Sequence, residues 1–197
     1  MAQTEKQKAD KEKCRIITPE FRVSYPHVFK AQAPSPKDAK KFSVTMLFPK
    51  TADLSTIKEA MKQAKLLKYG SKENWPEDLI SPVNNGDDPK FEGKEGYKGH
   101  WAIKASTSED NRPGVVDEDG EPILDASKFY PGCYARACVF AYCWEYMGKE
   151  GVGFILDHVQ KLNDGDSFGG KKSAEQVFGP VRKKSKPAED EDEMDFR

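Results

Sequence analysis

The most regular pattern in the chain is an alternation of apolar and polar side chains with a period of two. Between Phe42 and Phe48 every second residue is large and apolar. Successive side chains of a β-strand point to opposite faces, so the alternation predicts a strand with one buried face. An earlier strand is predicted within 15–29, where three apolar residues share one parity: Phe21, Val23 and Tyr25.

Four later segments carry similar patterns. Residues 97–106 predict a strand with Tyr97, Trp101 and Ile103 on one side, and residues 112–123 predict a short strand and a turn. The segments 134–146 and 152–162, joined through glycines, predict the longest hairpin of the molecule.

One stretch has the spacing of a helix instead. Between Asp53 and Gly70, apolar residues recur at intervals of three and four among lysines. Asp53 is a good N-cap and Gly70 a good helix stop, so a helix is expected between them. The following segment, 71–96, is rich in Pro, Gly, Asn and Asp and is interpreted as a long loop.

The length suits one domain with loose ends. We expect residues 1–14 to be disordered, residues 15–180 to form the domain, and residues 181–197 to be a basic linker and an acidic tail. Many strands, one helix and few parallel crossovers predict a mainly β protein, an antiparallel barrel.

The composition of the chain argues against a membrane protein or a secreted protein. No run of apolar residues is long enough to cross a membrane, and the start of the chain lacks the apolar core of a signal peptide, so a cytoplasmic protein is expected. The chain has four cysteines, Cys14, Cys133, Cys138 and Cys143, and no two of them form a C-x-x-C pair. Neither a metal nor another cofactor is predicted.

The strongest candidate for a binding surface is the strand 135–146, because its two parities differ sharply in size. One parity is small throughout; the other holds Arg136, Cys138, Phe140, Tyr142, Trp144 and Tyr146. The small side fits the inside of a curved barrel, and the aromatic side predicts a platform on which unpaired bases stack. The alternative is that these rings fill the core; that alternative stays open above all for Phe140.

A second candidate is the basic parity of 97–106, made of Lys98, His100 and Lys104, which could neutralise phosphates or be a plain solvated face. A third candidate is the tail, whose charge resembles a strand of phosphates. It could compete for a basic groove, dock on a partner protein or merely aid solubility. Its residues of interest are Glu189, Asp190, Glu191, Asp192, Glu193, Asp195 and Phe196.

Two signals suggest enzymes only weakly. Residues 165–172 approach a phosphate-binding P-loop, but Lys172 stands where a magnesium-binding hydroxyl belongs. The run 117–119 could hold a metal, yet acidic residues before Gly120 are usual in a tight turn. Three scattered histidines have no matching nucleophile, so no catalytic centre is predicted: His27, His100 and His158.

Several motifs together resemble a known family: Arg22-Val-Ser-Tyr25, Phe48-Pro-Lys50, Arg112-Pro-Gly-Val-Val-Asp117, Phe129-Tyr-Pro-Gly-Cys-Tyr-Ala-Arg136 and Val159-Gln-Lys-Leu-Asn-Asp-Gly165. Over about residues 15–180 the chain resembles phage and prophage single-stranded DNA-binding proteins with an OB fold, first catalogued as a domain of unknown function. It is more distantly similar to the single-stranded DNA-binding proteins of podoviruses.

The resemblance implies an aromatic and basic groove on an OB barrel, and an acidic tail that shields the groove and contacts replication proteins. It implies DNA contacts at Arg22, Lys98, Lys104, Arg112, Arg136, Tyr142 and Trp144. Here Arg197 follows Phe196, where such tails usually end on the aromatic residue.

The leading hypothesis is therefore a sequence-tolerant binder that coats single strands during phage replication or recombination in the bacterial host, with no cofactor, no membrane contact and a possible homodimer. One alternative is a phage scaffold protein whose tail docks on partners without DNA binding. Another is a metal-dependent nuclease using Asp117, Glu118 and Asp119.

Overall fold

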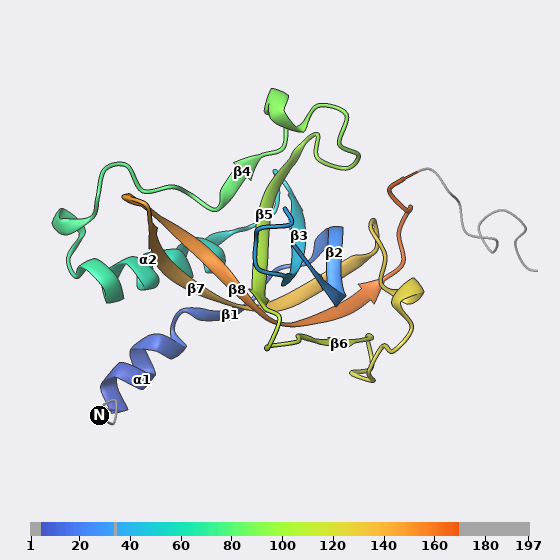
Figure 1. The fold of residues 1–197 in the computed structure, drawn as a ribbon, viewed down its shortest axis with the longest axis horizontal. Helices are drawn as coiled ribbons and strands as arrows, with labels where there is room; N and C mark the ends of the chain where they lie inside the picture. Colours follow the sequence, from blue (N-terminus) through green and yellow to red (C-terminus); the bar gives the residue numbers. More distant parts are fainter. Residues whose placement is uncertain (1–4, 34, 170–197) are drawn as a thin grey trace, which may run out of the picture.

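The computed structural model describes residues 5–33 and 35–169 (Figure 1). The acidic tail, the basic run before it and Lys172 lie outside the described residues. In the part that is described, no helix is long and apolar enough to cross a membrane.

Residues 5–33 and 35–169 fold into eight strands with one main helix, which confirms the mainly β prediction. The strands are β1 (Arg15–Ile17), β2 (Phe21–Gln32), β3 (Lys41–Pro49), β4 (Val83–Asn85), β5 (His100–Ser108), β6 (Gly114–Val116), β7 (Tyr134–Tyr146) and β8 (Lys149–Asn163). The helices are α1 (Glu5–Glu12), α2 (Ser55–Tyr69) and the short 3₁₀ turns η1 (Lys72–Asn74), η2 (Pro89–Phe91) and η3 (Ala126–Lys128).

The sheet closes on itself. Its strands run in the order β1-β7-β2-β3-β5-β8-β6, β4 joins the edge of β5, and β7 also pairs with β8, so β7, β2, β3, β5 and β8 form a ring. Most pairs are antiparallel, but β8 runs parallel to both β5 and β6. This OB-like arrangement is the one expected, with these two parallel pairs added.

The core fills the inside of the ring. Register places Val23 beside Met46 and Met46 beside Ile103, and all three side chains are at most 1% exposed. On β7 the small parity faces the same interior, as predicted: Ala135, Ala137, Val139 and Ala141. Small side chains let the strand curve closely around the core.

Helix α2 lies where its pattern predicts it. Ile57, Ala60 and Ala64 are buried, and the helix packs against β7. The Asp53 carboxylate accepts a hydrogen bond of 2.9 Å from the Ser55 backbone N–H, although Leu54 is the capping residue. Gly70 ends the helix with φ 75°, a conformation that favours glycine.

Helix α1 lies within residues 1–14, and an ion pair between Lys13 and Asp10 joins its end to the chain that follows. Two expectations about the strands are corrected. The strand predicted at 97–106 begins only at His100, because Tyr97 turns back over the sheet. The hairpin turn is the pair Met147-Gly148, with φ 49° and 73°, rather than the four residues from Gly148 to Gly151.

Candidate functional site

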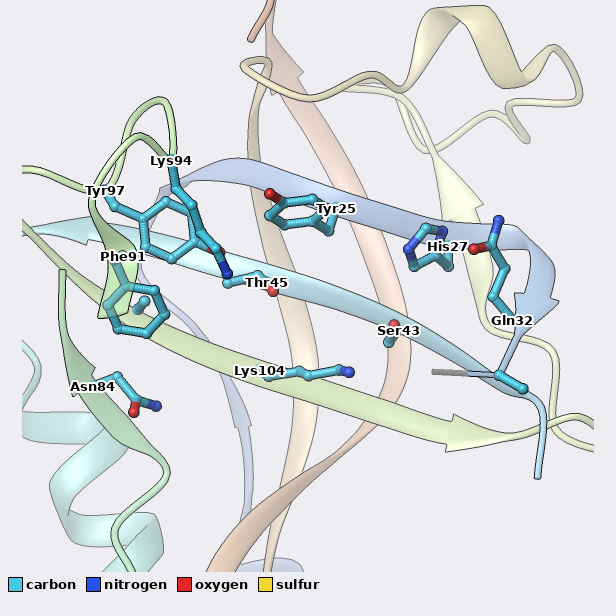
Figure 2. A pocket seen from close by; sticks show the side chains of 12 residues that line it. Tyr25, His27, Gln32, Ser43, Thr45, Asn84, Phe91, Lys94, Tyr97 and Lys104 are labelled. Atoms are coloured by element: carbon cyan, nitrogen blue, oxygen red, sulfur yellow. The ribbon is translucent and has the colours of Figure 1, made fainter. Parts of the chain in front are cut away.

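A groove of about 410 Å³ lies on the outer face of β2, β3 and β5 (Figure 2). Ser24 pairs with Thr45, and Thr45 with Lys104, across the three strands. Each follows or precedes by one residue a member of the buried row inside the ring, so its side chain points to the opposite face of the sheet. The groove is lined by Tyr25, His27, Gln32, Ala33, Ser43, Thr45, Asn84, Phe91, Lys94, Tyr97, Ala102 and Lys104.

Tyr25 enters the groove through an irregularity in β2. The pairing of β2 with β3 shifts register between Ser24 and His27, and Tyr25 has φ 45°, which is rare for a residue other than glycine. The shift moves its ring out of the parity of Phe21 and Val23, so it is 51% exposed. The expectation that Tyr25 shares their buried face is therefore wrong, because a β-bulge redirects side chains.

The opposite wall comes from residues 86–99, which we call the groove loop. The loop closes tightly: a Cβ on Gly86 would lie 2.0 Å from the Tyr97 carbonyl oxygen, and the Asp87 carboxylate accepts the Gly99 N–H at 2.7 Å. The rings of Phe91 and Tyr97 stack with centroids 4.8 Å apart. Tyr97 itself is buried, and burial raises the pKa of its hydroxyl.

Lys94 lies among three aromatic rings. Its Nζ is 5.2 Å from the centroid of Phe91 and 5.7 Å from those of Tyr25 and Tyr97. Each distance is within the range of a cation–π contact. Neither Lys94 nor Lys104 forms an ion pair with any residue in 5–33 or 35–169, so both charges are free to meet an anion.

The far end of the groove is polar. Figure 2 shows His27 and Gln32 on β2 and Ser43 on β3 at this end, with Lys104 between them and the rings. Burial, followed by the charge of Lys104, lowers the pKa of His27, which is therefore neutral at pH 7. The groove thus joins flat rings, the positive charges of Lys94 and Lys104 and uncharged hydrogen-bonding groups, a combination suited to a flexible polyanion with planar substituents.

A family model described as the Enterobacter phage Enc34 single-stranded DNA-binding protein matches residues 14–194. The chain belongs to this family. The search of curated proteins gave no match.

Solved structures of the Enc34 family member share the fold. The single-stranded DNA-binding protein of bacteriophage Enc34 in complex with ssDNA is 26% identical, with a TM-score of 0.66 over 79% of this chain and 89% of that one. Its C-terminal truncation is 25% identical, with a TM-score of 0.65 over 78% and 88%. Gp2.5 of bacteriophage T7, a single-stranded DNA-binding protein, shows likeness of fold alone, at 16% identity and a TM-score of 0.56 over 89% and 98%.

Of the residues singled out in the sequence, Lys104 lies in the groove. His100 begins β5 on the same face, and its Nδ1 lies 2.9 Å from the Lys98 carbonyl oxygen, while Lys98 is exposed in the turn before the strand. Arg112 is exposed ahead of β6, and Arg136 donates to the Gln160 side chain at 2.8 Å.

The aromatic residues of β7 form a separate surface. They face outward, as the parity predicts, but Tyr142 and Trp144 rest on glycines of β8: a Cβ on Gly153 would lie 3.0 Å from the Tyr142 ring, and one on Gly151 would lie 2.5 Å from the Trp144 ring. Tyr146 is 70% exposed near the hairpin tip. Phe140 is half-buried against the core. None of these four lines the groove.

The enzyme-like signals have structural uses. The Asp117 carboxylate accepts the backbone N–H groups of Asp119 and Glu121, as the turn interpretation predicts. His158 accepts the Gly114 N–H at 3.1 Å, and Gly165 lies against Tyr134. Within the described ranges no cluster of His, Cys, Asp or Glu has the arrangement of a metal site.

Sequence reasoning missed most of the groove: Tyr25, Phe91, Lys94 and Tyr97. A signal was present in the groove loop, where aromatic residues and lysines alternate with glycines from Phe91 to Gly99. Aromatic and basic residues interleaved in a loop are typical of nucleic-acid contacts.

Proposed function

We propose that this chain binds single-stranded DNA of any sequence in the groove, with bases stacking on Tyr25 and Phe91 and with Lys94 and Lys104 meeting phosphates. The observation that carries the proposal is the gathering of Tyr25, Phe91 and Tyr97 around Lys94, which has no acidic partner among the residues that the structure describes. Every base offers a flat face to an aromatic ring, which explains tolerance of sequence. A duplex hides those faces within its own stack.

The wider role extends this proposal. The chain coats exposed strands during phage replication or recombination in the cytoplasm of a bacterial host and catalyses no reaction. Its tail, 188–197, regulates access to the groove and recruits replication proteins, and the protein can form a homodimer. Lys98, His100 and Arg112, with the outward residues of β7, remain candidate contacts for a longer DNA path.

The proposal is tested by comparing labelled single-stranded and duplex oligonucleotides by fluorescence anisotropy over a salt series. Single strands bind more tightly, and the logarithm of the association constant falls linearly with the logarithm of salt concentration. Equal affinity for duplex, or tighter binding at higher salt, contradicts the proposal.

Replacing Lys104 by Gln removes one phosphate contact. Since each contact adds about 0.7 to the salt slope for single strands, the slope of Lys104→Gln falls by about that amount. Lys58→Gln, an exposed lysine on α2, keeps the wild-type slope and serves as the matched control. An unchanged slope for Lys104→Gln would place the phosphates elsewhere.

Acid pH is expected to strengthen binding through His27. Its pKa is lowered in the free protein, so it gains a proton only below its ordinary range. The proton adds a positive charge beside the DNA, and a polyanion favours the charged form, so affinity rises as pH falls. The measurement is the dissociation constant between pH 8 and pH 5 for wild type and His27→Gln, in which this rise is absent.

A further inference from the structure

The last described segment of the chain, residues 164–169, lies along the ring as a strap. The Phe168 N–H donates to the Pro131 carbonyl oxygen at 3.0 Å, and the Gly165 N–H donates to the Tyr130 hydroxyl at 3.2 Å. A Cβ on Gly165 would lie 2.3 Å from the Gly132 carbonyl oxygen. The backbone of the strap is therefore pressed directly onto residues 130–132.

Arg22 fixes the strap through contacts with its backbone and with Phe168. Its guanidinium donates to the carbonyl oxygens of Asp166 at 2.8 Å and Gly132 at 3.3 Å. It also lies 4.5 Å from the centroid of the Phe168 ring. These contacts fix where Phe168 lies.

Phe168 in turn supports the groove loop. Its ring fills the space beside Gly96: a Cβ there would lie 2.2 Å from the ring. The next residue reinforces the contact, because the Gly169 N–H donates to the Glu95 carboxylate at 2.6 Å. Phe168 and Phe91 both pack against the small cluster of Leu47, Tyr97 and Ala102 under the loop.

We propose that Arg22 and Phe168 are positioning residues for the groove: they hold the loop that carries Phe91, Lys94 and Tyr97 in its binding geometry. The inference rests on the proposed function for its consequence in DNA binding. The physical reason is preorganisation. Gly93, Gly96 and Gly99 all have φ between 75° and 81°, so the loop has much conformational entropy to lose, and a loop already ordered binds more tightly.

The assignment changes the role expected for Arg22. The resemblance implies that this arginine contacts DNA, but its N–H groups donate to two backbone carbonyls and its flat face lies near two rings, Phe168 and Tyr134. It acts on DNA through the strap and the loop.

The experiment measures hydrogen exchange of the groove loop in the full-length protein without DNA, together with affinity for a labelled single strand. In Phe168→Ala the loop amides exchange about tenfold faster, while amides of β7 and β8 exchange at the wild-type rate. Affinity falls by about tenfold, the loss of one ordered stacking contact. Phe168→Leu, which refills most of the space, restores both values toward wild type, and Leu124→Ala, an exposed apolar residue, changes neither.

Two variants keep the test decisive. Glu95→Gln weakens the hydrogen bond from the Gly169 N–H without changing the core. It is expected to speed exchange in the groove loop, so it tests the same support if Phe168→Ala does not fold. In a Phe91→Ala background, Phe168→Ala costs less affinity than in wild type, because the wall it supports is already damaged.

Loop exchange at the wild-type rate in Phe168→Ala and Glu95→Gln overturns the inference, as does faster exchange spread over β7 and β8. Failure of the wild-type protein to bind single strands overturns the proposed function instead. The exchange result is independent of DNA, so the two failures are distinguishable.

Discussion

A Tyr25→Asn, Phe91→Ala double variant binds single-stranded DNA about 100-fold more weakly than wild type. Stacking on one ring is worth about 1 to 3 kcal/mol per base, and two rings are removed. Asn is chosen at position 25 because it tolerates the φ of 45° found there, so the bulge of β2 keeps its shape. The measurement is the anisotropy of a labelled oligothymidine at fixed salt.

The matched control is Tyr142→Ala with Trp144→Ala, which removes two rings from the other aromatic surface. If the groove holds the bases and β7 adds contacts only to a longer DNA, this control stays within a few-fold of wild-type affinity for a short oligothymidine. Loss of binding in the control, with retention in the groove variant, would move the site to β7 as the sequence first indicated. Urea unfolding of both variants checks that neither has lost its fold.

Regular elements of this protein could be predicted from sequence because their periodicity is local. The alternation in β3, the two parities of β7 and the spacing of α2 each follow from one face meeting the core. Glycine at the end of α2 follows from the conformation that the helix stop requires. In all of these the pattern and its cause lie within the same short segment.

The groove could not be predicted in this way, because its residues owe their positions to irregularities. Tyr25 is displaced by a bulge, and nothing in its alternation with Phe21 and Val23 indicates the slip. Tyr97 continues the parity of β5 in the sequence, yet the chain turns before the strand begins. The sequence alone does not show which aromatic residues line the groove, those of β7 or those of the groove loop, because this depends on how distant segments pack together.

Near the strap, a glycine allows two stretches of backbone to approach closely. Gly132 has φ 104°, and a Cβ there would lie 2.0 Å from the Asp166 carbonyl oxygen. That oxygen is also the acceptor for Arg22. A side chain at position 132 would therefore push the strap away from residues 130–132 and weaken the hydrogen bond from Arg22 to Asp166, which helps to place the groove loop.

Gly132→Ala is accordingly expected to cost about 2 to 5 kcal/mol of the free energy of unfolding, the sum of backbone strain and overpacking. The control is Gly148→Ala in the hairpin turn, where φ is 73° but no atom lies within 4 Å of the added Cβ. Strain alone acts there, so the cost is about 1 to 2 kcal/mol. Urea denaturation gives both values.

An equal cost for the two variants would mean that the strap yields to the added methyl group at no expense. The loop amides would then exchange faster in Gly132→Ala, because Asp166 would have moved away from Arg22. A larger cost for Gly132→Ala instead means that the strap resists displacement. That resistance is what a segment must have if it is to hold the wall of a binding groove in place.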